Sequence, residues 1–191
     1  GAAAVLGAFT GLREAGAAAS VTGWLMCTDN MPSGTAYKLG DVLTARDGTT
    51  VEVKNTDAEG RIVMMDAIAL AVEEGVDAII DIATLTGAAL MALGQLTAPV
   101  LGNDQRVVDL TLAASAVTGE PLWQLPLERK YRPQLDSDVA DLANIGGRYA
   151  GATTAALFLD HFTRKTPWAH LDIAGTMAVD ADESWRSKGA T

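Results

Sequence analysis

Residues 76–83 are the segment that most constrains how this chain can fold. They form an apolar run that is broken only by Asp77 and Asp81. A short apolar run without alternation is typical of a strand that is covered on both faces, as in a parallel sheet. Because small and polar residues and then a helical pattern follow it directly, the run predicts a strand that leads into a helix.

The same alternation of short apolar runs and helical patterns continues along the chain. We expect helices at 2–19, 61–74, 87–94, 106–118 and 152–163, and strands at 20–28, 41–46, 50–54, 76–83, 98–102 and 168–173. The pair Asp47-Gly48 predicts a hairpin turn, and Gly75 suits the end of the helix before it. The pattern predicts an α/β fold: one domain over residues 1–191, with a mostly parallel mixed sheet flanked by helices on both faces.

Composition limits the partners of this chain. With 191 residues, 49% of them apolar, the chain can bury an aliphatic core of its own. The net charge of −10 argues against nucleic-acid and membrane-surface partners. The single cysteine, Cys27, excludes an internal disulfide and fits a reducing compartment. No apolar run suits a membrane span, so we expect a cytoplasmic protein.

The segment NTDAEGR, at residues 55–61, holds two carboxylates and a guanidinium at alternate positions. In an extended chain Asp57, Glu59 and Arg61 would project to the same side. Carboxylate oxygens suit a divalent metal ion, and the neighbouring arginine suits an anion beside it. This interpretation predicts one edge of a metal-dependent active site.

An ordinary helix start is the alternative interpretation of the same segment. Asn55 or Thr56 could cap a helix, with Glu59 as the partner in a capping box. Carboxylates are also common at helix N-termini and in solvated turns. The spacing alone leaves the metal site and the helix cap both open.

Two other segments follow expected strands at the position where α/β folds bind ligands. The segment TLTG at residues 84–87 follows one strand, and Ala174 and Met177 follow the last one. Each could line a pocket, although Thr84 or Thr86 could equally cap a helix and Met177 could pack in the core.

Isolated histidines and aspartates in apolar runs give weaker signals. His161 and His170 suit satisfied imidazoles better than zinc ligands. Asp81 and Asp172 could each be a paired carboxylate or a group that binds a neighbouring loop. Cys27 falls in a strand pattern and is expected to be inert.

Five segments, in order, resemble motifs of the leucyl (cytosol) aminopeptidase family. They are NMP with GTAY and GDV at residues 30–42, NTDAEGR at 55–61, DIATLTGA at 81–88, NIGG at 144–147 and WAHLDIAG at 168–175. The likeness extends from residue 1 to residue 191 and corresponds to the C-terminal catalytic domain of the family.

The resemblance implies a metal-dependent aminopeptidase that removes leucine and other large apolar N-terminal residues from peptide substrates. Asp57 and Glu59 would bind two divalent metal ions, manganese or zinc with magnesium or cobalt as further candidates, and Glu59 would bridge them. Arg61 would act in catalysis by holding a bicarbonate ion, the general base. The substrate-binding residues would be Asn55, Ala58, Thr84, Leu85, Thr86, Gly87, Ala174 and Met177. The full-length protein would be a homohexamer.

The chain departs from the family pattern at both ends. The family's metal-binding lysine, two further metal-binding aspartates and a second catalytic lysine lie upstream of the position that matches Gly1, and its closing C-terminal segment is missing. We therefore expect a catalytic domain truncated at both ends, which binds metal weakly and is inactive by itself. The alternative is a non-catalytic scaffold or assembly protein that retains the fold; the intact motifs favour the enzyme.

Overall fold

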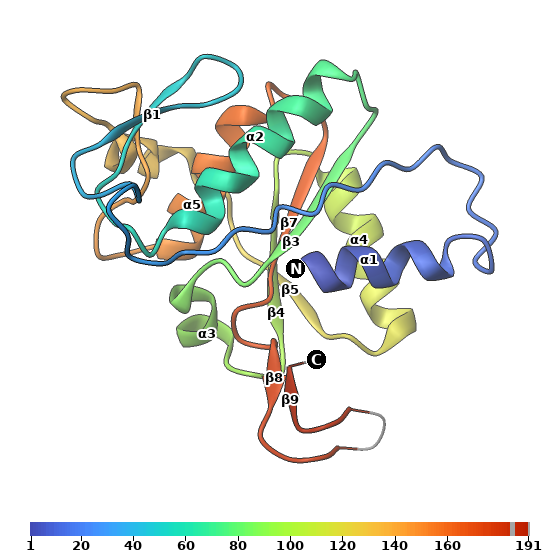
Figure 1. Cartoon of the computed structure of the whole chain (residues 1–191). Helices are drawn as coiled ribbons and strands as arrows, with labels where there is room; N and C mark the ends of the chain where they lie inside the picture. The colour runs from blue at the N-terminus through green and yellow to red at the C-terminus, as the bar shows by residue number, and fades with distance from the viewer. Residues whose placement is uncertain (184–185, 191) are drawn as a thin grey trace.

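A four-stranded sheet lies at the centre of the computed structural model, which describes residues 1–183 and 186–190 (Figure 1). Its strands, in spatial order, are β3 (Ile79–Ala83), β7 (Trp168–Asp172), β4 (Ala98–Gly102) and β5 (Leu122–Gln124). The pairs β3–β7 and β4–β5 are parallel, and β4–β7 is antiparallel. The sheet is therefore mixed and mostly parallel, as predicted.

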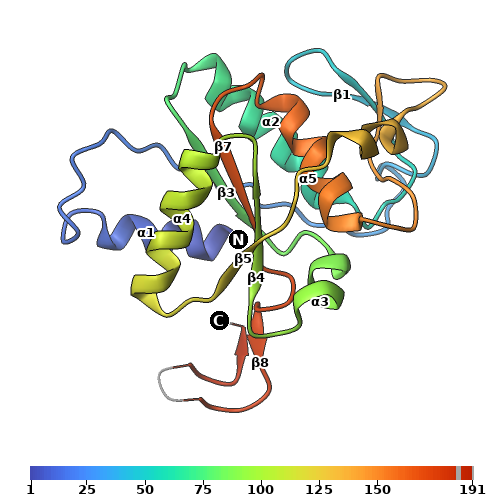
Figure 2. The same cartoon turned by 180° about the vertical axis from the view of Figure 1, so that it is seen from behind.

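Helices cover both faces of this sheet (Figures 1 and 2). One face carries α2 (Glu59–Glu73), α3 (Gly87–Leu93) and α5 (Gly151–Phe162), and the other carries α4 (Gln105–Thr118). The helix α1 (Ala2–Gly11) contacts β3. The main core contains the fully buried Phe158, Phe162 and Trp168, and a smaller core forms where Val108 of α4 packs on Val100. The α/β prediction is confirmed.

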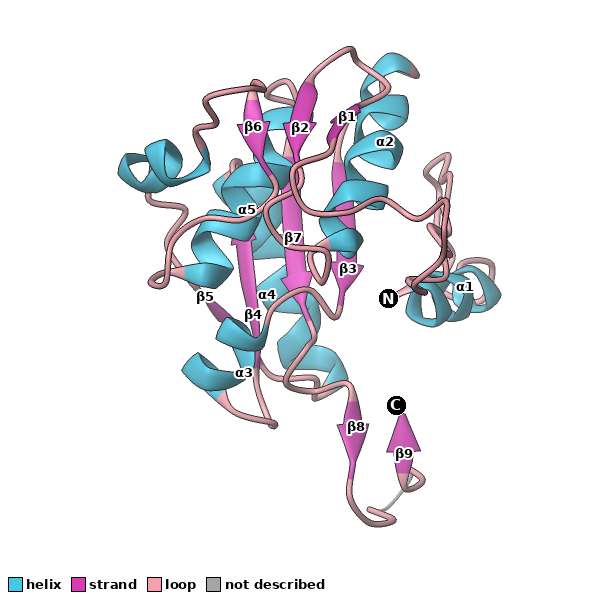
Figure 3. Ribbon diagram, turned by 60° about the vertical axis from the view of Figure 1, so that its left-hand side comes forward, coloured by secondary structure: helices cyan, strands magenta, loops and turns pink. Residues whose placement is uncertain are grey.

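A second, smaller sheet lies on the opposite side of α2 and α5 from the first, and its strand β2 leads into the segment 55–61 (Figures 1 and 3). It consists of β1 (Val42–Thr44), β2 (Thr50–Glu52) and β6 (Leu142–Ala143). The predicted hairpin joins β1 and β2, and Gly48 takes a φ of +88° that favours glycine. The remaining elements are the 3₁₀ helix η1 (Arg129–Leu135) and the antiparallel pair β8 (Ala178–Val179) and β9 (Gly189–Ala190).

The ends of α2 and α3 show why the sequence signals worked. Gly75 has a φ of +71° and donates to Val72, while Val76 donates to Ala71, so α2 ends in the motif that a glycine favours. Thr86 is the N-cap of α3, and its hydroxyl accepts a hydrogen bond from the Ala89 amide. Both ends were signalled by residue type alone.

Three predicted elements differ in the structure. The first helix ends at Gly11 instead of residue 19 and buries none of its residues. Residues 20–28 form no strand and are mostly exposed, because an extended segment is stabilised only by a partner strand; Cys27 is therefore exposed outside any element. The strand β3 begins at residue 79 and is not covered on both faces: Ile80 is 61% exposed. Among the described residues β3 pairs with β7 alone, so it is an edge strand.

None of the helices within residues 1–183 and 186–190 has the length and apolarity needed to cross a bilayer.

Candidate functional site

Asn144 fixes the backbone that enters the segment 55–61. Its Oδ1 accepts hydrogen bonds from the amides of Lys54 (2.8 Å) and Asn55 (3.1 Å), and its Nδ2 donates to the Asn55 carbonyl (2.6 Å). The side chain is fully buried, and the pairing of β2 with β6 brings it to this place. Asn144 belongs to the NIGG segment, so this motif holds the NTDAEGR segment in position.

The start of α2 differs from the extended conformation and from the capped helix that the sequence suggested. Asn55 Oδ1 accepts a hydrogen bond from the Asp57 amide (2.9 Å), which makes a local turn. The N-cap of α2 is Ala58, with no side-chain cap, so the predicted capping box is wrong. The prediction of an extended segment is also wrong, because Asp57 lies in a turn and α2 begins at Glu59. Glu59 is partly exposed, whereas Arg61 is buried.

Two residues of the loop at 30–42 converge on the carboxylates. Asn30 Nδ2 donates to Glu59 Oε2 (3.0 Å) and to the Thr56 carbonyl (3.1 Å), and the Tyr37 hydroxyl donates to the same carbonyl (2.9 Å). Burial raises the pKa of Tyr37, and the negative charges of Glu59 and Asp57 raise it further. Asn30 and Tyr37 therefore hold the loop at 30–42 against the segment that carries the carboxylates.

Asp57 and Glu59 fit one part of a divalent metal site. Their oxygens are the type of ligand that hard cations prefer, and Asp57 is exposed. Among the described residues, however, no group of three histidines, cysteines, aspartates or glutamates is placed to hold a metal ion. Asp57 and Glu59 alone would therefore not complete a metal site within the described part of the chain.

Arg61 is the most unusual group of the site. Its side chain is buried, and neither Nε nor Nη1 has a hydrogen-bond partner among the described residues. Burial lowers its pKa to about 10, and the negative charges of Asp172 and Glu59 oppose that shift. At this pKa the guanidinium remains a cation at neutral pH. Buried N–H groups are almost always hydrogen-bonded, so this arrangement fits a small anion bound at Arg61.

Asp172 organises the second predicted segment. This fully buried residue accepts hydrogen bonds at Oδ1 from the amides of Leu85 (3.0 Å), Thr86 (3.2 Å) and Ala174 (3.3 Å). Its Oδ2 accepts from the Thr86 hydroxyl (2.6 Å). Of the two roles open to Asp172, it therefore has the second: it binds a neighbouring loop.

Two glycines, Gly60 and Gly175, allow the segments of the site to pack closely together. A Cβ placed on Gly60 would lie 3.6 Å from Cδ1 of Leu85, so the first turn of α2 contacts the segment 84–87. A Cβ on Gly175 would lie 2.3 Å from the carbonyl oxygen of Gly94, so the segment after β7 presses against the end of α3. The site thus lies where α2 and α3 begin and where β3 and β7 end.

The structure brings most of the predicted site residues to this place. Those joined by the contacts above are Asn55, Asp57, Ala58, Glu59, Arg61, Leu85, Thr86 and Ala174. Thr84, Gly87 and Met177 are exposed at the same segments, Met177 by 48%.

Comparison with known proteins agrees with this geometry. Residues 1–191 match the model of the cytosol aminopeptidase family, catalytic domain. The chain belongs to the cytosol aminopeptidase family.

Its relatives in this family are longer proteins. The chain is 47% identical over 191 residues to a probable cytosol aminopeptidase of Alkaliphilus metalliredigens, 50% over 194 residues to one of Bordetella pertussis and 49% over 191 residues to one of Synechococcus. Each match covers 100% of this chain and 38% of the relative. The chain therefore spans about two-fifths of the length of these cytosol aminopeptidases.

The prediction of satisfied imidazoles is wrong for His170, because its buried Nε2 has no hydrogen-bond partner among the described residues. His170 is fully buried, and its Nδ1 pairs with Asp81, which also accepts a hydrogen bond from Trp168 Nε1. Burial lowers the pKa of His170, but the charge and hydrogen bond of Asp81 outweigh it, so the pKa is raised overall. Asp81 is thus a paired carboxylate, the first of its two predicted roles.

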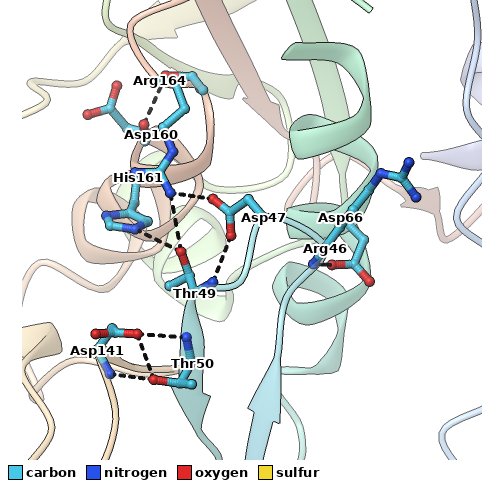
Figure 4. Close-up of polar contacts among 10 residues, drawn as sticks. Arg46, Asp47, Thr49, Thr50, Asp66, Asp141, Asp160, His161 and Arg164 are labelled. Atoms are coloured by element: carbon cyan, nitrogen blue, oxygen red, sulfur yellow. Dashed lines mark hydrogen bonds and ion pairs between the residues drawn. The ribbon is translucent and has the colours of Figure 1, made fainter. Parts of the chain in front are cut away.

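A cavity of about 540 Å³ lies near His161, away from the candidate site. Figure 4 shows the polar contacts around His161. The charged groups of the cavity are largely neutralised: Arg164 pairs with Asp47 (2.5 Å), and Arg129 pairs with Asp160 (2.6 Å). His161 Nε2 lies 3.4 Å from the Thr49 hydroxyl, and burial and then the charge of Arg164 lower its pKa. The cluster fastens the end of α5 to the hairpin. The lining residues are Asn103, Arg129, Asp160, His161, Arg164 and Lys165.

Proposed function

We propose that the native polypeptide that contains this chain is a metal-dependent aminopeptidase. It would hydrolyse the N-terminal residue of peptides, with a preference for leucine and other large apolar residues. The observation that carries the proposal is the buried Arg61, whose Nε and Nη1 have no partner among the described residues, beside the carboxylates of the NTDAEGR segment. Family membership supports the same activity.

Asp57 and Glu59 would hold two divalent metal ions, manganese or zinc, with magnesium or cobalt as further candidates. When bound, such ions lower the pKa of a water molecule and polarise the scissile carbonyl. Because the described residues offer no group of three histidines, cysteines, aspartates or glutamates, the remaining donors would come from outside the described residues. The hydrogen bond from Asn30 would fix the orientation of the Glu59 carboxylate.

Arg61 would bind bicarbonate, which would serve as general base. A planar guanidinium can donate two parallel hydrogen bonds to a planar anion, and it cannot accept a proton itself. Burial in the site excludes competing water and strengthens the interaction. Arg61 thereby places the base beside the carboxylates.

The segments after β3 and β7 would bind the peptide. The main chain of Leu85 and Gly87 would orient the substrate, with Thr84 and Thr86 in the same segment. Leu85, which approaches Gly60, would form an apolar wall for the first side chain, together with Ala174 and Met177. Asn55 and Ala58 would line the metal side of this pocket.

The test uses the native full-length polypeptide with leucine amide as substrate. We expect release of leucine that a chelator abolishes and that manganese or zinc restores. The control compound is N-acetyl-leucine amide, which lacks the free amine and should remain intact. If leucine amide stays intact with each of manganese, zinc, magnesium and cobalt, the result contradicts the proposal and favours the scaffold interpretation.

Assembly and location belong to the same proposal. The full-length protein would form a homohexamer in the cytoplasm. Light scattering of the purified protein tests the assembly, and a mass other than that of six chains would contradict it.

A further inference from the structure

We propose that Asp172 is a positioning residue of the aminopeptidase, which fixes the peptide-binding segment 84–87 beside Arg61. This inference rests on the proposed function and assigns a role to a residue outside the predicted metal and substrate ligands.

The hydrogen bonds of Asp172 are concentrated on the peptide-binding segments. One buried carboxylate accepts three backbone N–H groups and one hydroxyl, and these donors belong to the loops that follow two different strands. Hydrogen bonds to an ionised carboxylate are about twice as strong as neutral ones. Removal of the charge should therefore loosen both loops together.

The sheet register explains why Asp172 can reach the segment 84–87. In the parallel pair β3–β7, Asp172 lies opposite Ala83, and the Ile173 amide donates to the Ala83 carbonyl (2.8 Å). Both strands therefore end at the same level. The amides of Leu85 and Thr86 lie just beyond the last strand pair, where Asp172 takes the place of a backbone acceptor.

The effect of Asp172 continues into α3 through Thr86. The Thr86 hydroxyl donates to Asp172 (2.6 Å) and accepts from the Ala89 amide (3.0 Å), which is the N-cap bond of α3. The carboxylate thus orients the hydroxyl that begins the helix. Loss of either partner should disturb the segment from Leu85 to Ala89.

The same carboxylate also acts on Arg61. Its negative charge is the larger of the two that oppose the effect of burial on the Arg61 pKa, ahead of Glu59. Asp172 therefore balances the catalytic cation while its oxygens hold the loop that would carry the substrate.

The experiment compares Asp172→Asn with wild type in the native full-length protein. The substitution keeps the size of the side chain and removes its charge. We expect the KM for leucine amide to rise about tenfold while kcat changes by less than about threefold, because ground-state positioning of the peptide is lost. Amide hydrogen exchange of the peptide 84–90 should become at least about tenfold faster.

Two further variants separate positioning from folding. Thr86→Val removes one donor to Asp172 and should raise KM and loop exchange in the same direction. Asp81→Asn is the matched control, since Asp81 is a carboxylate of the adjacent strand that binds His170 and Trp168. It should lower thermal stability without a change in KM or in exchange at 84–90.

The outcomes are distinct. A higher KM with faster exchange in both test variants, but not in the control, supports the inference. Unchanged exchange at 84–90 overturns it, and so does a fall in kcat at constant KM, which would place the effect of Asp172 on Arg61 or on the amount of folded enzyme and not on the substrate loop. If wild type cleaves no leucine amide, the proposed function fails, and exchange alone then decides whether Asp172 holds the loop.

Discussion

Replacement of Gly175 by alanine should destabilise the protein, because there is no room for a methyl group at this position. The added Cβ would lie 2.3 Å from the Gly94 carbonyl oxygen and 3.4 Å from the Leu90 Cα, and both are backbone atoms of α3 or its C-cap. Contacts below 3.0 Å are essentially never seen for Cβ atoms, so the two segments must separate by at least about 0.7 Å. Overpacking of this kind costs about 1–3 kcal/mol.

The assay is the midpoint of thermal unfolding. About 2–4 °C are lost per kcal/mol in a domain of 150–250 residues, so the midpoint should fall by about 2–12 °C. Gly7→Ala is the control, since a Cβ at Gly7 meets nothing within 4 Å and alanine favours the helix α1. An unchanged midpoint for Gly175→Ala would refute the argument that the segment after β7 is pressed against α3.

Three further predictions concern single side chains. Glu59→Ala should abolish leucine amide hydrolysis, measured at saturating metal; activity above about 1% of wild type would contradict the metal assignment. Arg61→Met should lower kcat about 100-fold or more, because the group that would hold the general base is removed; an unchanged kcat would contradict the catalytic assignment. Because the pKa of His161 is lowered in the folded protein, the unfolded chain binds the proton first as pH falls, so the contribution of His161 to stability should decrease from about pH 7 to about pH 5.5, while the raised pKa of His170 acts in the opposite direction. His161→Gln should flatten this dependence, and equal slopes for both proteins would exclude His161 as its source.

The elements that the sequence located well are those whose signals are local. β4, α3, α4 and α5 begin and end within one residue of their predicted limits, because apolar period, N-caps and glycines mark them. The predicted strand at 20–28 failed for the opposite reason. Its pattern is extended, but a strand also needs a neighbour, which no local pattern supplies.

For the candidate site, too, the sequence identified what depends on local residues and missed what depends on distant partners. Asp57, Glu59 and Arg61 could be selected from residue type and family likeness, yet their orientation could not, because it depends on whether α2 begins before or after Glu59. The role of Asn144 was not predicted, and for Asp172 two roles stayed open, because their partners lie about 90 residues away in the chain. For Asp172 one signal was available: it is an aspartate at the end of an apolar strand.

The exposed edge of β3 has a practical consequence for anyone who produces this chain by itself. An edge strand with unpaired backbone groups is a template to which another extended chain can add, and Ile80, 61% exposed, gives it an apolar surface as well. Among the described residues only α1, which contacts β3, would limit such pairing, so we expect copies of the isolated chain to associate edge to edge. Expression together with a segment that covers β3 should raise the yield of monodisperse material.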